Sequence, residues 1–147
     1  TSELNIPQGN LIIYNYEVRK LNENRQAILE QLVILKNKIV PDLVLVPSLH
    51  DIHQDHQTIA NEGLRAFKNT TIWGYELLWN NITFDTQCFV RLDKKHIQNK
   101  ANALKHYKSQ QQRAYMQIDF ILGQARMRGV QAGCEYAEAF EVIRQII

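Results

Sequence analysis

The sequence has few of the residues that mark secreted or membrane proteins. Among 147 residues there are only two cysteines, Cys88 and Cys134, which lie far apart and without metal-type spacing. They fit reduced thiols in a cytoplasmic protein better than a disulfide framework, although a single bridge remains compatible with the sequence. No stretch approaches eighteen apolar residues, and the first ten residues lack a basic segment followed by an apolar one. We therefore expect a soluble, cytoplasmic, non-secreted chain.

The sequence also lacks a strong charge of either sign and any glycine-rich nucleotide motif. The net charge is only +2, and the basic residues are spread along the chain, which argues against nucleic acid or a membrane surface as a partner. The six glycines are scattered, and no Gly-x-Gly-x-x-Gly follows an apolar run, so a dinucleotide-binding domain is poorly supported. An apolar content of 45% is ordinary for a globular domain with a core.

The pattern of apolar residues predicts alternating strands and helices. Predicted strands cover residues 11–16, 43–48, 71–79 and 86–92, and predicted helices cover 22–40, 55–68, 94–109 and 115–129. Gly129 is placed to end the last helix. The alternation predicts right-handed βαβ units in an α/β fold with a Rossmann-like, mostly parallel sheet and flanking helices. Ligands of such sheets bind beyond the carboxyl ends of the strands.

A cluster of polar residues, PSLHDIHQDH at 47–56, begins where the strand 43–48 is predicted to end. His53 and His56 lie three residues apart with Asp55 between them. One neutral imidazole can bind Zn²⁺ while a second handles substrate protons. A neighbouring carboxylate can orient an imidazole and raise its pKa. The cluster therefore indicates a metal-hydrolysis site.

A structural interpretation of the same cluster carries about equal weight. Asp55 is a suitable helix N-cap and Asp51 a suitable turn residue, although Asp51 and His50 are also suitable partners for the two imidazoles. A catalytic zinc centre usually has three protein ligands, so one His-x-Asp-His stretch does not complete it. His96 and His106 lie on a predicted helix at a spacing typical of a solvated face. The residues alone thus indicate half of a site.

The motif DIHQDH resembles the LmbE-like, or PIG-L, family of zinc-dependent N-deacetylases. Further stretches that are similar to the family lie at 41–68, 73–80, 107–115 and 128–144. The resemblance implies a Rossmann-like fold, a zinc cofactor and removal of an acyl group, typically acetyl, from an amino-sugar derivative. It also implies a small-molecule substrate.

The resemblance assigns roles to individual residues. It makes His56 a zinc ligand, and it makes His53 the histidine that stabilises the tetrahedral intermediate and protonates the leaving amine. Asp55 would be the carboxylate that orients the His53 ring. Arg19, in YEVRK, and Glu138, in YAEAF, are weaker candidates for contact with substrate. Their alternative roles are those of a surface arginine and of a carboxylate at a helix start.

The sequence departs from the family in one respect. The family's N-terminal His-Pro-Asp-Asp-Glu-like loop supplies the remaining zinc ligands and the general base, but neither Pro7, Pro41 nor Pro47 is followed by two aspartates. We therefore expect residues 1–147 to be the central and C-terminal part of one such domain, with weak zinc binding and no catalysis on its own. The alternative is a non-catalytic α/β module that binds sugar or another subunit and keeps a vestigial site. Exposed sheet edges would favour self-association.

Overall fold

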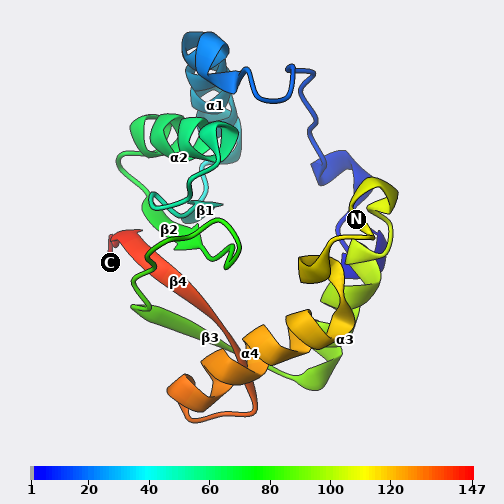
Figure 1. The fold of residues 1–147 in the computed structure, drawn as a ribbon. Helices are drawn as coiled ribbons and strands as arrows, with labels where there is room; N and C mark the ends of the chain where they lie inside the picture. The colour runs from blue at the N-terminus through cyan, green and yellow to red at the C-terminus, as the bar shows by residue number, and fades with distance from the viewer. Residues whose placement is uncertain (1) are drawn as a thin grey trace. The chain divides into compact units, whose positions relative to one another are not determined.

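The computed structural model describes residues 2–147, which form two compact units (Figure 1). The first unit contains residues up to 14 together with 89–138, and the second contains 15–88 together with 139–147. Cys88 and Cys134 are both free and half-buried. No helix within 2–147 combines the length and the apolar character needed to cross a bilayer.

The sheet has four strands in the order β1-β2-β4-β3. The strands are β1 (Leu43–Pro47), β2 (Thr71–Tyr75), β3 (Cys88–Leu92) and β4 (Tyr136–Arg144). β1 and β2 are parallel in register from Leu43 opposite Thr71 to Pro47 opposite Tyr75, whereas β4 runs antiparallel to β2. The predicted α/β class and the parallel pairing of β1 with β2 are thus confirmed, in a sheet that is mixed.

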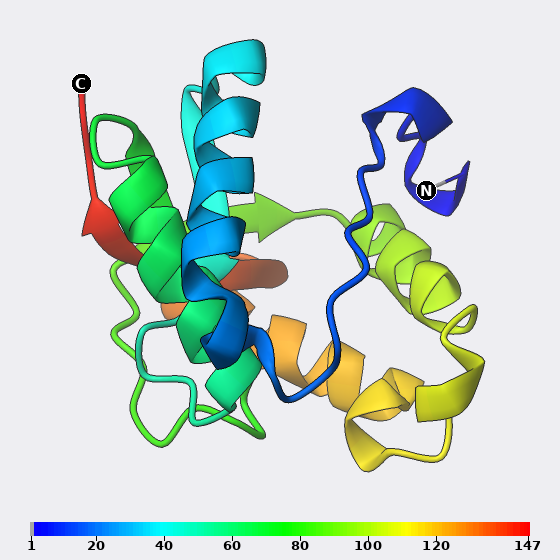
Figure 2. The same ribbon diagram turned by 90° about the horizontal axis from the view of Figure 1, so that it is seen from above.

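Two helices cover the sheet in the second unit. α1 (Arg25–Ile39) and α2 (Gln54–Ala66) lie side by side in both ribbon views (Figures 1 and 2). The buried core beneath them consists of Val46, Ala66, Phe67 and Ile72. A Cβ atom at Gly63 would lie 2.9 Å from a methyl group of Val46, so this glycine lets α2 approach β1 closely.

The first unit is built on two helices, α3 (Lys94–Leu104) and α4 (Ile118–Ala132). They pack through a core made by Ile97, Ala101, Ile121 and Ala125. Short 3-10 turns complete the chain at Ser2–Leu4, Gln8–Asn10, Leu21–Asn24, Lys108–Gln110 and Ala114–Met116.

Three sequence predictions about elements were wrong. Residues 11–16 form no strand, because a β-rich composition makes a strand only where a partner strand completes its hydrogen bonds. β4 was missed, because alanines and glutamates of low strand propensity lie between its strand-forming tyrosine, phenylalanine, valine and isoleucine. Gly129 does not end α4; Gly133 does, with a φ of +66° in the left-handed region that favours glycine.

The two glycines inside α4 are predicted to respond in opposite directions to alanine. A Cβ at Gly129 would lie 2.5 Å from the Glu135 carbonyl oxygen, whereas a Cβ at the exposed Gly123 would meet nothing within 4 Å. Gly129→Ala should therefore lower the free energy of unfolding by about 1–3 kcal/mol through overpacking. Gly123→Ala should raise it by about 0.5–1 kcal/mol through helix propensity. Urea unfolding curves measure both, and an equal effect of the two substitutions would contradict this account.

Candidate functional site

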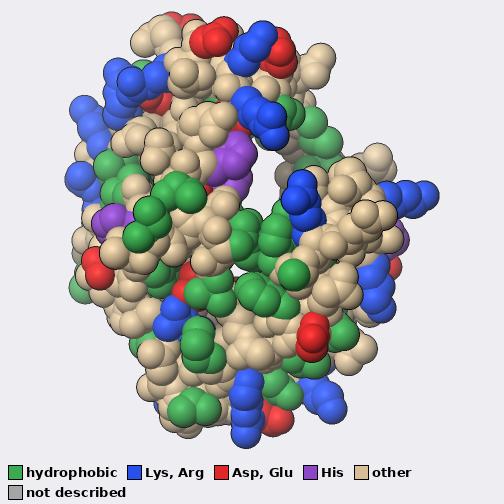
Figure 3. All heavy atoms as spheres, viewed as in Figure 1, with side chains coloured by type: hydrophobic (Ala, Val, Ile, Leu, Met, Phe, Trp, Pro, Cys, Tyr) green, Lys and Arg blue, Asp and Glu red, His purple; other side chains and the backbone are tan. Residues whose placement is uncertain are grey.

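The predicted histidine cluster lies at the carboxyl end of β1, in the loop 48–53 and the first turn of α2. The Ser48 backbone N–H donates to the Tyr75 carbonyl at 3.2 Å, which fixes the start of the loop against the end of β2. The Ser48 hydroxyl in turn accepts from the His50 backbone N–H at 3.0 Å. Figure 3 shows histidine side chains at the molecular surface. The loop is therefore held in place, and its His50 side chain is half-exposed.

His56 is oriented by the carboxylate of Asp51. The Nδ1 atom of His56 lies 2.7 Å from Oδ2 of Asp51, which is 1% exposed, and the other oxygen of Asp51 accepts from the His53 backbone N–H at 2.8 Å. An ionised carboxylate only accepts, so Nδ1 of His56 carries the proton and Nε2 keeps its lone pair. The His56 side chain is 32% exposed. This is the carboxylate–histidine arrangement found at protein metal ligands.

His53 is held in the opposite tautomer. It is the N-cap of α2, and its Nδ1 accepts from the Asp55 backbone N–H at 3.2 Å. The remaining nitrogen, Nε2, therefore carries the hydrogen in the neutral ring. The rings of His53 and His56 stack with centroids 4.5 Å apart and an interplanar angle of 24°. The stacked pair thus places the Nε2–H donor of His53 beside the Nε2 lone pair of His56.

The predicted role of the Asp55 carboxylate is wrong. Its oxygens accept from the backbone N–H groups of Arg19 at 2.6 Å and Leu21 at 3.3 Å, and only the Asp55 backbone contacts the His53 ring. Arg19 adopts a φ of +69°, and its side chain is exposed. Asp55 therefore anchors the segment that precedes α1, and Asp51 is the carboxylate that orients an imidazole.

Glu141 is a site residue that sequence reasoning missed. It lies in β4, is 4% exposed, and accepts from Nδ1 of His50 at 2.8 Å. The candidate from the same stretch, Glu138, instead forms an ion pair with Lys100 at 2.6 Å in the first unit. Strand alternation puts residues two apart on one face and would have separated the two glutamates, but β4 was not predicted as a strand.

The electrostatics of the loop follow from these contacts. The hydrogen bond to Glu141 raises the pKa of His50, against a smaller opposing effect of burial, and the charges of Glu141 and Asp85 raise it further. Burial raises the pKa of Tyr75, and the charge of Asp51 adds to this effect. Tyr75 therefore stays protonated at neutral pH and serves as a neutral neighbour of the loop.

Among residues 2–147, one side chain, that of His56, is suited to bind a metal ion. Nε2 of His56 has the orientation and exposure of a zinc ligand, but residues 2–147 contain no group of three histidine, cysteine, aspartate or glutamate side chains placed to hold a metal. A catalytic zinc centre usually needs three protein ligands and a water. The zinc role predicted for His56 therefore stays a prediction.

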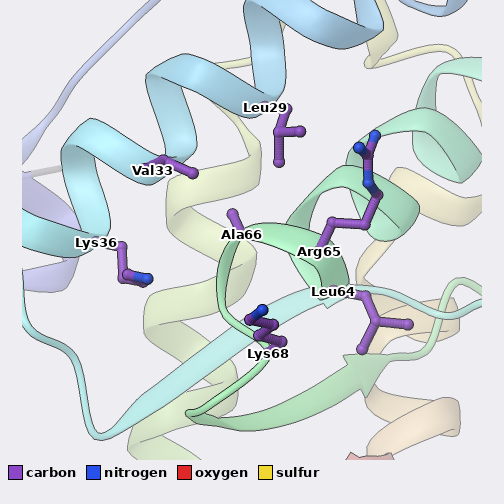
Figure 4. A pocket seen from close by; sticks show the side chains of 7 residues that line it. All are labelled: Leu29, Val33, Lys36, Leu64, Arg65, Ala66 and Lys68. Carbon is purple, nitrogen blue, oxygen red and sulfur yellow. The ribbon is translucent and has the colours of Figure 1, made fainter.

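A groove between α1 and α2 lies apart from this cluster. It has a volume of about 590 Å³ and is shown in Figure 4. Its lining consists of Leu29, Val33 and Lys36 on α1 and Leu64, Arg65, Ala66 and Lys68 on or just after α2. None of the three histidines of the cluster 47–56 lines it, so it is not part of the candidate site.

Comparisons with known proteins place the fold. No model of a protein family matches the chain, and no curated protein sequence matches it. Among solved structures, N,N'-diacetylchitobiose deacetylase from Pyrococcus horikoshii is similar with a TM-score of 0.67 and 19% identity, over 88% of this chain and 55% of that protein. The zinc-inhibited form of teicoplanin deacetylase Orf2 is similar with a TM-score of 0.64 and 14% identity, over 92% and 57%.

A third solved structure has a different activity. It is GalB, a 4-carboxy-2-hydroxymuconate hydratase from Pseudomonas putida KT2440, with a TM-score of 0.61 and 18% identity over 83% of this chain and 60% of that protein. The chain thus spans somewhat over half the length of each of the three proteins. The fold implied by the resemblance to LmbE-like deacetylases is confirmed. Because the same fold serves deacetylases and a hydratase, the reaction has to be argued from the site.

Proposed function

We propose that the protein containing this chain is a zinc-dependent N-deacetylase, an amide hydrolase that removes an acyl group from an N-acyl amino sugar or a similar small conjugate. The observation that carries the proposal is the buried Asp51 carboxylate, which leaves Nε2 of His56 free beside the Nε2–H of His53. Membership in the LmbE-like family is part of this proposal, and the fold shared with two deacetylases supports it.

Each residue of the pair has a separate role. His56 would hold zinc through Nε2, and Asp51 keeps that nitrogen free by accepting the proton on Nδ1. When bound, zinc supplies a Lewis acid and lowers the pKa of a bound water. His53 presents Nε2–H as a donor for the oxyanion of a tetrahedral intermediate. The proposal places the other zinc ligands outside residues 2–147, and Arg19 and Glu138 remain predicted substrate contacts.

The proposal is tested by assaying the full-length protein on N-acetyl amino sugars with added zinc, next to a His56→Gln variant. Glutamine keeps a polar side chain but removes the imidazole, so free amine should form with the wild-type protein and fall to background with the variant. Equal deacetylation by both proteins would sink the assignment of His56. A wild-type protein that binds no zinc near neutral pH and deacetylates nothing would instead support a non-catalytic module.

A further inference from the structure

Glu141 is a buried carboxylate that the proposed reaction does not use. One of its oxygens, Oε1, lies 2.8 Å from Nδ1 of His50 and accepts from the Asp85 backbone N–H at 3.2 Å. His50 belongs to the loop 48–53, and Asp85 belongs to the segment 76–87 that follows β2. One oxygen atom in β4 therefore holds two segments that are distant in sequence.

The same two segments also meet at His56. Asp51 forms a bridge with Asn81, and the Ile52 backbone N–H donates to the Asn80 carbonyl at 3.1 Å. The side-chain nitrogen of Asn80 lies 3.5 Å from Nδ1 of His56. The surroundings of the imidazole therefore depend on the relative position of the two segments that Glu141 joins.

The Glu141 carboxylate is packed so closely that the residue opposite it in β2 has no room for a side chain. Gly74 in β2 lies opposite Glu141 in the sheet register. A Cβ atom at Gly74 would lie 3.0 Å from Oε2 of Glu141 and 3.2 Å from the Cα atom of Ser48. Such distances are tighter than ordinary van der Waals contact. The absence of a side chain at Gly74 thus allows the carboxylate to reach the loop.

We propose that Glu141 is a positioning residue for the His53–His56 pair. It acts through the His50 side chain and the Asp85 backbone, and it does not contact the reacting groups. By fixing His50 it fixes Asp51, the next residue, whose carboxylate selects the tautomer of His56. The proposal rests on the proposed function only for its effect on zinc binding; its effect on the state of the His56 ring is independent of that function.

The contact between His50 and Glu141 is stronger when the His50 ring is charged, so its strength depends on pH. The charged groups that face His50 are Glu141 on β4 and Asp85 in the segment after β2, and both favour the imidazolium. Because the pKa of His50 is raised in the folded protein, the contact with Glu141 is strongest below the ordinary histidine value of 6.5. It weakens as the pH rises through the raised pKa of the folded state.

The test uses Glu141→Ala and Glu141→Gln in the full-length protein, with Glu135→Ala as the matched control, because Glu135 is an exposed glutamate directly before the same strand. Histidine ring ¹⁵N NMR reports the tautomer of His56, and competition with a chelator gives the dissociation constant for zinc. Glu141→Ala should mix the two His56 tautomers, lower the pKa of His50 and weaken zinc binding about 10-fold or more. Glu141→Gln, which still offers an acceptor oxygen, should restore much of the tautomer preference, and Glu135→Ala should change nothing.

A wild-type His56 tautomer and wild-type zinc affinity in Glu141→Ala would overturn the proposal. Should that variant fail to fold, His50→Ala removes the same link at a half-exposed side chain without disturbing the core, and it should shift the His56 tautomer in the same direction. No shift in His50→Ala would also contradict the proposal. If the wild-type protein binds no zinc, the proposed function fails, while the tautomer measurement still decides the role of Glu141.

Discussion

Replacing His53 by alanine is expected to lower kcat for deacetylation by about 10²–10³ and to leave the zinc content unchanged, since the loss of one oxyanion donor has this size in other hydrolases. The backbone N–H of Asp55 occupies Nδ1 of His53, so the only hydrogen that the neutral ring offers is on Nε2. Steady-state kinetics with an N-acetyl amino sugar and metal analysis of the same samples measure the two quantities.

Two controls separate the role of His53 from general effects of losing a histidine. His106→Ala removes an imidazole whose side chain is 70% exposed and should leave kcat unchanged. With p-nitrophenyl acetate, whose leaving group needs no proton, His53→Ala should lose as much activity as with the amide, because an oxyanion forms in both reactions. A loss confined to the amide would instead assign His53 to protonation of the leaving amine and would contradict the tautomer that the geometry indicates.

The second large effect is expected at the ionic network between α1 and α2. Glu62 is fully buried on α2 and accepts from Nε of Arg25 and Nη1 of Arg65, each at 2.6 Å. The double variant Arg25→Ala/Arg65→Ala leaves this carboxylate buried without a cation. We expect the free energy of unfolding to fall by about 3–5 kcal/mol, the cost of an uncompensated buried charge. Urea unfolding of the full-length protein measures the change.

A third substitution tests whether the charge of Glu62 is the cause. Adding Glu62→Met to the double variant replaces the buried carboxylate by an apolar side chain of similar volume and should recover most of the lost stability. Lys20→Ala, which breaks an exposed pair with Glu17, should cost at most about 1 kcal/mol. A double variant as stable as the wild type would show that Glu62 is protonated or hydrated in the folded protein.

The sequence predicted where the histidine cluster lies in the fold, because that position depends on local patterns. The apolar run of β1 and the amphipathic pattern of α2 place the loop 48–53 at the carboxyl end of a strand. What the loop carboxylates do depends on contacts with distant segments. The Asp55 carboxylate is bonded to the backbone of Arg19, 36 residues away, and not to the His53 ring as predicted; the carboxylate that contacts an imidazole is that of Asp51, at His56.

The roles of the C-terminal glutamates were beyond the reach of local patterns for a similar reason. Glu138 and Glu141 lie in the same alanine-rich stretch, and only the register of β4 against β2 shows that Glu141 faces Gly74 and the site loop. That register is fixed by pairing across more than 60 residues of chain. The alanines and glutamates of β4 lie between its strand-forming residues, so the local sequence does not tell which glutamate is buried.

The central claim is that Asp51 prepares Nε2 of His56 to bind zinc. The most direct test is the zinc dissociation constant of the full-length protein and of its Asp51→Asn variant, measured by chelator competition at neutral pH. Asparagine keeps the shape of the side chain but removes the charge that holds the proton on Nδ1. The account predicts zinc binding that is about 10–100-fold weaker in the variant. Equal affinity in the two proteins would contradict it.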